Sequence, residues 1–363
     1  MGVLRCVKFA IYFGLALFVS AFLVSGCRKD VWKQGVQSNE IVFDGDIPER
    51  GITPVRYIES FRDSIYVDDV FGMLYSREYG LFMTMLLQKN VLYLNKSLDI
   101  TGIIGEPGEG PGEFGTPSFL ALNDDSLYIG DNDGMEVYTA GGEYVRTVRG
   151  FQIPRKFDVY DGFIYVNTLH RDYPISKVNL KGEVVAGFGK WRHEERPNYR
   201  ALNTRFIQAT DEGDIIAVPA VEPVVERYTK DGKLLQTLNL EHLKALGRLY
   251  ENVKQKNEEY EKKGMFRNIN VVFGDVYLQK EKNRLFLLCA GWPGKDAGTY
   301  LLVVDLSHSK MTPMELLRLY GVGGSGKSVL RRLSVSDDDR IIAVDSYSGG
   351  ILVYDIAEND LVP

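Results

Sequence analysis

Cysteine and histidine are scarce in this sequence, with 3 and 4 residues among 363. Three cysteines cannot make a disulfide framework or a four-ligand zinc site, and the histidines, at positions 170, 193, 242 and 308, offer no metal-binding pair at i,i+4 spacing. A basic block is also missing, and the formal net charge of −6 argues against a nucleic-acid surface. The sialidase Asp-box and the Gly-x-Ser-x-Gly nucleophile elbow are absent as well. The composition therefore excludes several common enzyme and binding classes.

No apolar run is long enough for an ordinary membrane-spanning helix. Phe9–Val24 is apolar for 16 residues, whereas a span needs about 20. Arg5 and Lys8 precede the run, and Val24-Ser-Gly-Cys27 ends it, so residues 1–26 read as a secretory signal. The ending resembles the bacterial lipobox, which implies that Cys27 is lipidated. A plain anchor, or an ordinary signal with a chance cysteine, is the alternative.

The export signal predicts the location of the protein and the composition of the mature chain after cleavage. We expect a lipidated tether over residues 27–38 and anchoring in the bacterial cell envelope, at the outer membrane, with the periplasmic or the surface side left open. Loss of Arg5 and Lys8 takes the net charge from −6 to −8. Cys289 is then the one cysteine of the folded part. It lies in the apolar run Leu285–Ala290, so we predict a small buried hydrophobe and no disulfide.

One β-rich phrase recurs through the rest of the chain: polar turn residues, a short apolar strand, a partner strand and a glycine turn. We count six copies of its first strand, at Asp63–Asp68, Asp125–Asp131, Asp161–Asn167, Gly213–Val218, Asn283–Leu288 and Asp338–Asp345. Partner strands follow, for example Met135–Tyr138 and Ile351–Asp355. Short strands joined by Gly and Asn/Asp turns are typical of antiparallel meanders.

Six such units predict an all-β fold, a six-bladed β-propeller over residues 39–363. The 337 residues that follow the signal, divided by six, give about 56 residues for each blade. The last repeat stops after its third strand, and Glu40–Asp44 is a strand without a partner. We therefore predict that Glu40–Asp44 pairs into the last blade and closes the ring. Residues 241–263 have helical apolar spacing and a charged opposite face, which predicts a surface helix inserted between blades four and five, packed on a blade rim or docking a partner.

The stretch Ile103–Gly150 resembles one NHL repeat, with a Gly-rich lead, Gly108-Glu-Gly-Pro-Gly-Glu-Phe114, followed by three strands. Together with the lipobox, it is similar to the six-bladed β-propeller lipoproteins of Gram-negative bacteria, an NHL/TolB-like family without assigned chemistry. The resemblance implies a fold rather than an activity. Repeats three to five lack the Gly-rich lead, and their blade boundaries stay open.

A second Gly-rich segment, Gly321–Ser328, satisfies the phosphate-loop pattern G-x4-G-K-[ST]. A phosphate loop needs a strand before it, and a helix and an α/β domain after it, but only two β strands follow here. The segment occupies the same place in its repeat as Gly105–Phe114. We interpret it as a turn between blades and expect no nucleotide.

Propeller loops bring two sets of residues to one face. The first is the richest cluster of aromatic and bidentate donors in the chain: Trp191, Arg192, His193, Arg196 and Tyr199. The second is His170, Arg171 and Tyr173. Such side chains suit flat polar ligands, glycans or a protein partner. The alternative is that they are solvated loop residues that clamp one another in ion pairs.

Acidic and amide residues at strand ends support a competing hypothesis, in which the protein is a metal-dependent enzyme. Asp68, Asp131, Asn167 and Asp345 could converge on the central channel and hold Ca²⁺ in a metal-dependent hydrolase or lactonase. The alternative is that these residues only form the turns at the ends of the strands. The leading expectation is a non-catalytic propeller without a cofactor. Its expected partners are the membrane, through the lipid anchor, and a glycan, a peptide or an envelope protein, with neither nucleic acid nor nucleotide.

Overall fold

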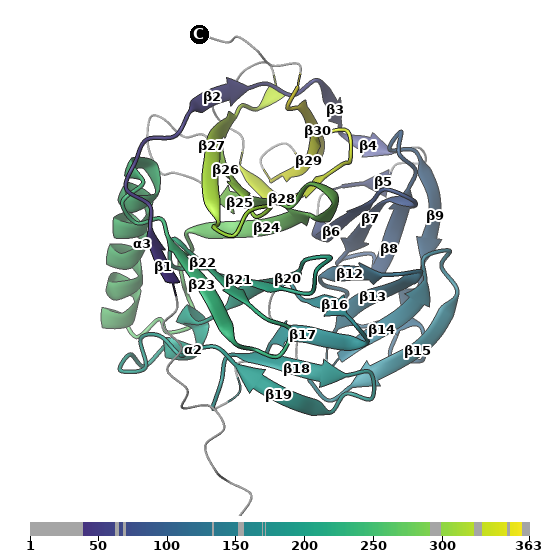
Figure 1. The fold of residues 1–363 in the computed structure, drawn as a ribbon. Helices are drawn as coiled ribbons and strands as arrows, with labels where there is room; N and C mark the ends of the chain where they lie inside the picture. The colour runs from purple at the N-terminus through teal and green to yellow at the C-terminus, as the bar shows by residue number, and fades with distance from the viewer. Residues whose placement is uncertain are drawn as a thin grey trace, which may run out of the picture. The chain divides into compact units, whose positions relative to one another are not determined.

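Six four-stranded antiparallel blades surround a central channel (Figure 1). The structure is a computed structural model that describes residues 39–61, 65–67, 70–132, 134–151, 156–168, 170, 172–290, 299–322, 329–346 and 349–357. The six-bladed propeller predicted from the repeats is confirmed. The signal segment 1–26, Cys27 and the tether 27–38 lie outside the described residues, as do Arg171, Asp68 and most of the phosphate-loop-like segment.

Each blade contributes one inner strand to the channel and three further strands outward. The inner strands are β6 (Val70–Ser76), β12 (Leu120–Asn123), β16 (Asp158–Tyr160), β20 (Arg205–Ala209), β24 (Phe273–Gln279) and β28 (Leu330–Val335). The second strands are β7 (Gly80–Met85), β13 (Ser126–Asp131), β17 (Phe163–Asn167), β21 (Ile215–Pro219), β25 (Arg284–Cys289) and β29 (Arg340–Asp345). The third strands are β8 (Asn90–Leu94), β14 (Gly134–Thr139), β18 (Ile175–Asn179), β22 (Val224–Tyr228), β26 (Thr299–Asp305) and β30 (Gly350–Asp355).

The outer strands are β9 (Ile100–Ile104), β15 (Tyr144–Arg149), β19 (Val184–Phe188), β23 (Leu234–Asn239) and β27 (Thr312–Leu319), with β3 (Arg56–Ile58) in blade six. Glycine turns precede three of them, and Gly142, Gly182 and Gly232 all have positive φ there, which glycine adopts without strain. Two short pairs lie between blades: β4 (Ser60–Phe61) with β5 (Ile65–Tyr66), and β10 (Glu106–Pro107) with β11 (Glu113–Phe114).

The strand that closes the ring is not the one predicted. Glu40–Asp44 was expected in the last blade, but β1 (Asn39–Val42) pairs in parallel with β23 at the edge of blade four. β2 (Glu49–Ile52) covers the edge of blade five in the same way. It is β3 that pairs with β30 and closes blade six, with Ile58 buried opposite Ile351. Ile41 and Phe43 pack against the apolar cluster of blades four and five, which holds β1 there.

The first repeat was also misassigned. Asp63–Asp68 was expected to be a blade strand, but its described part, β5, pairs only with β4. The second strand of blade one is β7, whose sequence GLFMTM lacks the recurring polar phrase. All six residues of β7 are buried, because the middle strands of a blade pack on both neighbouring blades.

The predicted insertion is a helix, α3 (Lys244–Lys262), slightly shorter than the expected 241–263. Leu246, Leu249 and Val253 pack into the apolar cluster of blades four and five. The helix ends before Gly264, which has positive φ. The short helix α2 (Tyr199–Leu202) lies in the connection from β19 to β20, and the 3-10 turn η2 (Lys280–Lys282) lies between β24 and β25. Among the described residues, no helix is long and apolar enough to cross a membrane.

Polar side chains join the inner strands of neighbouring blades, which share no continuous hydrogen-bond ladder. The bonds run from backbone N–H donors of one blade to side-chain oxygens of the preceding blade: Ala209 to Asp158 (2.8 Å), Leu278 to Gln208 (3.1 Å), Leu333 to Asp275 (3.0 Å) and Tyr75 to Ser334 (2.8 Å). Buried polar groups need such partners, and here they fix the blades around the channel.

Candidate functional site

The propeller has two faces, and they differ in how they use charged side chains. The face of the propeller at which the inner strands begin is called the strand-start face. The opposite face, at which the inner strands end, is called the strand-end face. The predicted residues 191–199 lie in the connection from β19 to β20, on the strand-start face. We call Trp191, Arg192, His193, Arg196 and Tyr199 the loop cluster.

The cationic side chains of the loop cluster contact carboxylates of this same chain. Arg192 donates to Glu222 and, at 2.9 Å, to Glu226, and His193 Nε2 lies 2.6 Å from Glu222 Oε1. Burial would raise the pKa of Glu222, but His193 and Arg192 hold it below its usual value. The opposing carboxylates likewise raise the pKa of Arg192, although burial alone would lower it. Glu222 and Arg192 are therefore both held in their charged forms by their contacts with each other and with their neighbours.

A fully buried arginine extends this network into blade four. Arg205 donates to the carbonyl oxygens of Asn203 (3.0 Å) and Lys190 (2.8 Å), and its Nε lies 3.4 Å from Glu226. The Tyr228 hydroxyl donates to the same carboxylate at 3.0 Å. Sequence reasoning missed Glu222, Glu226 and Arg205. One sequence feature could have indicated this network: Glu226 lies within the otherwise apolar strand VVERY. A glutamate is rarely buried unless it has a partner.

The remaining loop-cluster residues tie the connection to the inserted helix and to each other. Arg196 Nε donates to Glu261 of α3 at 2.8 Å. Trp191 and Tyr199 pack edge to face, with ring centroids 5.3 Å apart. The cluster therefore fastens α3 to blade four, which gives it a structural role whatever else it binds.

The second predicted set lies in the loop from β17 to β18. His170 stacks on Tyr173, with ring centroids 4.4 Å apart and an interplanar angle of 13°. Gly187 of β19 leaves room for the Tyr173 ring, since a Cβ there would meet it at 2.2 Å. His170 is exposed, and Arg171 lies outside the described residues.

The residues suggested for calcium end second strands in different blades. The Asp131 carboxylate accepts the N–H groups of Gly115 (3.1 Å) and Thr116 (2.6 Å). Asn167 binds the Pro174 carbonyl (2.7 Å), and Asp345 accepts from Val329 N–H (3.1 Å). Their polar atoms anchor backbone of the adjoining connections. Within the part of the chain that the structure describes, no three His, Cys, Asp or Glu side chains form a group that could hold a metal ion.

The Gly-rich lead of blade two also binds groups of its own chain. Gly110 N–H donates to Glu113 (2.8 Å), and Gly112 N–H donates to the buried Glu136 (3.4 Å). Glu136 also accepts from Thr147 (2.6 Å) and pairs with Arg149 (3.1 Å). These amides therefore hold carboxylates of blade two.

A buried lysine crosses the channel near the strand-start face. Lys156, just before β16, donates to the Val276 carbonyl (2.7 Å) and pairs with Asp275 (3.1 Å), both on β24 of blade five. The two charged side chains are 3% and 0% exposed, so the channel is filled at this point. Burial lowers the pKa of Lys156, and Asp275 opposes that effect. Sequence reasoning did not single out either residue.

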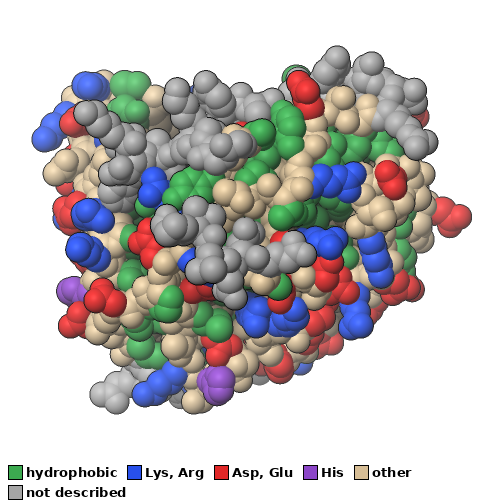
Figure 2. Space-filling view, turned by 90° about the horizontal axis from the view of Figure 1, so that it is seen from above, with side chains coloured by type: hydrophobic (Ala, Val, Ile, Leu, Met, Phe, Trp, Pro, Cys, Tyr) green, Lys and Arg blue, Asp and Glu red, His purple; other side chains and the backbone are tan. Residues whose placement is uncertain are grey.

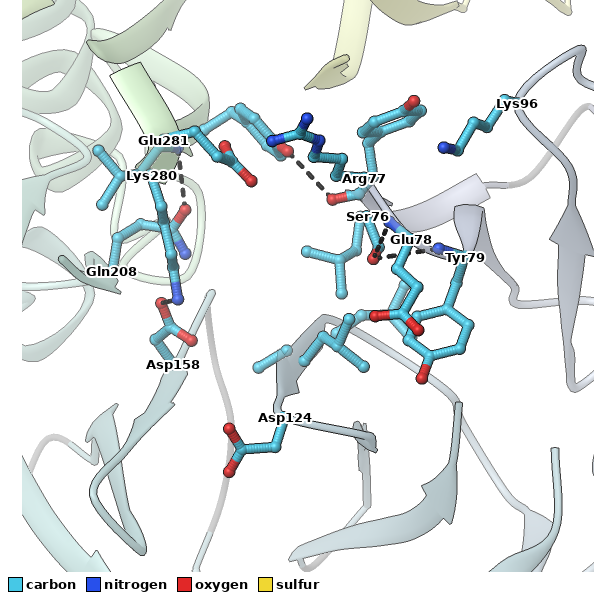
Figure 3. Close-up of a pocket in the computed structure, with 17 residues that line it drawn as sticks. Ser76, Arg77, Glu78, Tyr79, Lys96, Asp124, Asp158, Gln208, Lys280 and Glu281 are labelled. Atoms are coloured by element: carbon cyan, nitrogen blue, oxygen red, sulfur yellow. Dashed lines mark hydrogen bonds and ion pairs between the residues drawn. The ribbon is translucent and has the colours of Figure 1, made fainter. Parts of the chain in front are cut away.

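A cavity of about 550 Å³ opens on the strand-end side of this plug. Its lining comes from the inner strands of five blades, from loops that follow them, and from Lys96 in the loop between β8 and β9. Figure 3 shows the side chains around it. We call it the channel cavity. The labelled residues are Ser76, Arg77, Glu78, Tyr79, Lys96, Asp124, Asp158, Gln208, Lys280 and Glu281. Leu74, Ala121 and Leu278 add apolar surface. Its volume is in the range of small-molecule sites.

Charged side chains around the channel cavity are only partly paired. Lys280 binds the buried Asp158 at 3.0 Å, and Arg77 lies 3.5 Å from Asp337. Among the described residues, the charged ends of Glu78, Lys96 and Glu281 have no ion pair or hydrogen bond. This contrasts with the loop cluster. Sequence reasoning missed the cavity because its residues are far apart in the chain and lie in ordinary strands and turns of five blades.

The tyrosine hydroxyls at the cavity are already engaged. Tyr75 donates to Asp337 (2.9 Å), Tyr277 donates to the Tyr75 carbonyl (3.2 Å), and Tyr79 donates to Asp125 (2.6 Å). The bond to Asp125 raises the pKa of Tyr79 to about 12. The aromatic rings, rather than the phenol oxygens, are what these residues leave for a ligand.

The visible surface carries charges of both signs. Figure 2 shows Lys and Arg side chains interspersed with Asp and Glu on the face that it displays.

Comparison with known proteins identifies the fold of this chain but no activity. No family model matches the sequence, and no curated protein sequence matches it significantly. The crystal structure of a protein from Bacteroides fragilis that is described as exported superimposes on this chain with a TM-score of 0.52 and 12% sequence identity. The match covers 84% of this chain and 98% of that protein. Virginiamycin B lyase from Staphylococcus aureus has a TM-score of 0.45 and 10% identity, with 83% and 98% covered. The extracellular domain of a hybrid two-component system of B. thetaiotaomicron has a TM-score of 0.46 and 13% identity, with 85% and 34% covered. At these identities the likeness concerns the fold alone, and the chain is a six-bladed β-propeller.

Proposed function

We propose that this protein is an exported, lipid-anchored β-propeller that binds a small ligand in the channel cavity and does not transform it. The observation that carries the proposal is the cavity of about 550 Å³ whose lining includes charged side chains without a partner in the described chain. The arginines of the loop cluster, by contrast, contact carboxylates of this chain. A concave, partly apolar site with a few polar groups is the usual form of a ligand site.

The plug supports a pocket rather than an open pore. Lys156 and Asp275 fill the channel near the starts of β16 and β24, whereas most residues that line the cavity lie at the ends of inner strands or in the loops after them. A ligand entering from the strand-end face would therefore meet a closed floor. Closure on one side increases the surface that a small ligand buries.

The proposed location rests on the sequence around Cys27. The apolar run, the Val24-Ser-Gly-Cys27 ending and the polar residues after it favour export and lipidation. Replacing Cys27 with Ala is expected to move the protein from the membrane fraction and to remove the acyl mass from its N-terminal peptide. Membrane retention of Cys27→Ala, with an unmodified N-terminus in the parent protein, would contradict lipid anchoring.

The binding proposal is tested with the full-length protein in a non-ionic detergent. A thermal-shift screen of amines, carboxylates, sugars and short peptides identifies compounds, and calorimetry then compares three proteins. Glu281→Gln and Lys96→Gln change the cavity, and Glu194→Gln is the matched control, since Glu194 is an exposed carboxylate on the strand-start face. We expect at least one compound whose affinity changes in the cavity variants and not in the control.

Two results would reject the cavity as the site. One is a set of hits whose affinity responds to loop-cluster substitutions and not to Glu281→Gln or Lys96→Gln. The other is the absence of any hit that responds to the cavity substitutions. Stoichiometric Ca²⁺ in the purified protein, lost on replacing Asp131 or Asp345, would instead favour the metal-dependent hydrolase.

A further inference from the structure

We propose that the channel cavity selects small organic cations, that is, compounds with one or two ammonium groups on a short apolar chain. This inference rests on the proposed function, because it names the ligand class of the same cavity. It follows from three features of the lining: the balance of unpaired charge, the positions of the carboxylates, and the surface between them.

The unpaired charge of the cavity is negative. Two of its three basic residues already have carboxylate partners: Lys280 with Asp158 at 3.0 Å, and Arg77 with Asp337 at 3.5 Å. Lys96 is the remaining cation. Against it stand Glu78, Glu281 and Asp124, and the one side-chain bond of Asp124 comes from the neutral amide of Asn123 (3.0 Å). A cationic ligand would therefore improve the charge balance, and an anionic one would worsen it.

The three carboxylates come from different blades and border the same cavity. Glu78 lies in the loop after β6 of blade one, Asp124 in the loop after β12 of blade two, and Glu281 in η2 of blade five (Figure 3). An ammonium group donates up to three hydrogen bonds and can meet carboxylates from several directions. Two such groups on one chain could use carboxylates on opposite walls.

The surface between the carboxylates suits an alkyl chain. Leu74, Ala121 and Leu278 line the cavity together with the rings of Tyr75 and Tyr277. Aromatic faces attract ammonium ions, and apolar side chains bury methylene groups favourably. The phenol oxygens of Tyr75 and Tyr277 are occupied within the protein, so these side chains offer a ligand their ring faces rather than hydroxyl groups. These features favour an organic amine over a glycan.

The test is calorimetric titration of the full-length protein, in non-ionic detergent at low salt, with 1,5-diaminopentane and with glutarate as the anion of matched length. We expect the diamine to bind and glutarate not to bind. Glu281→Gln should weaken diamine binding by about three- to tenfold. Lys96→Gln should strengthen it by about two- to fivefold, because it removes a repelling charge. Glu194→Gln, on the other face, should leave the affinity unchanged.

The opposite signs of the two cavity variants make the proposal falsifiable without unfolding the protein. Glutarate binding that Lys96→Gln abolishes would overturn the cation proposal while upholding the cavity as a ligand site. No diamine binding, or diamine binding indifferent to Glu281→Gln, would also overturn the cation proposal. The proposed function fails separately, when no compound of the wider screen responds to either cavity variant.

Discussion

The loop cluster and the channel cavity are built from the same kinds of residue but use them differently. In the loop cluster, Arg192 and Arg196 each contact a carboxylate of the chain within 3 Å. In the cavity, Lys96 and Glu281 are exposed, and their charged ends have no partner among the described residues. The comparison teaches that a cluster rich in Arg, His and Trp can be a structural clamp, and that availability matters more than residue type.

The two regions also differ in what their loss would cost. Removing one partner of a buried ion pair leaves an uncompensated charge in a poorly solvated place, whereas an exposed carboxylate stays solvated when it is alone. Substitutions in the loop cluster should therefore lower stability, and substitutions in the cavity should change binding. Three experiments sharpen or break this division.

The largest effect is expected from Glu226→Gln. Glu226 is 5% exposed and accepts from Arg192, Arg205 and Tyr228, so its loss leaves the fully buried Arg205 without its carboxylate. We expect the free energy of unfolding to fall by about 3–5 kcal/mol, measured by denaturant titration. Glu281→Gln is the control at the cavity and should change it by less than about 0.5 kcal/mol. Equal losses in the two variants would remove the distinction between the regions.

A smaller effect is expected from the pH dependence of the clamp. The pKa of Glu222 is lowered in the folded state by His193 and Arg192, so its ionised form stabilises the fold. That contribution is present above the ordinary glutamate pKa and is lost as the pH falls through the folded value. Glu222→Gln should therefore be less stable than the parent at pH 7, and the gap should narrow on acidification below about pH 4.5. Unfolding curves between pH 7 and 3 measure this, and a constant gap would contradict it.

The smallest effect concerns the contact between the loop cluster and α3. Arg196 and Glu261 are partly exposed, with side chains 17% and 25% accessible. A double-mutant cycle with Arg196→Gln and Glu261→Gln should give a coupling energy of about 0.5–1 kcal/mol in unfolding experiments. A coupling of zero would show that this pair does not fasten the helix.

Much of the fold could be predicted because the blades repeat a local pattern. Five of the six expected first strands are second strands of blades, and their partners, such as β14 and β30, follow as expected. The pattern failed where local signals are weak. β3 has only three residues, and β7 lacks the polar phrase, so neither could be recognised without its pairing partner. β1 has good strand residues, but which edge it covers depends on the packing of Ile41 and Phe43.

The candidate site was predictable only in its residue types. The sequence marks out Trp191–Tyr199, but the carboxylates that bind side chains of this segment are 29 to 65 positions away and are brought close by the blade geometry. The channel cavity gathers residues between Leu74 and Glu281, which lie in the inner strands of five blades and in turns that look alike in sequence. Nothing local distinguishes Glu281 from any other exposed glutamate. Spatial convergence from five blades supplies that information.

The most direct test of the account compares one variant from each region in the same binding experiment. Titration of 1,5-diaminopentane into Glu281→Gln and into Arg196→Gln separates the cavity from the clamp. The account predicts that Glu281→Gln weakens the affinity by about threefold or more and that Arg196→Gln leaves it unchanged. Weakened binding in Arg196→Gln, with unaltered binding in Glu281→Gln, would contradict it.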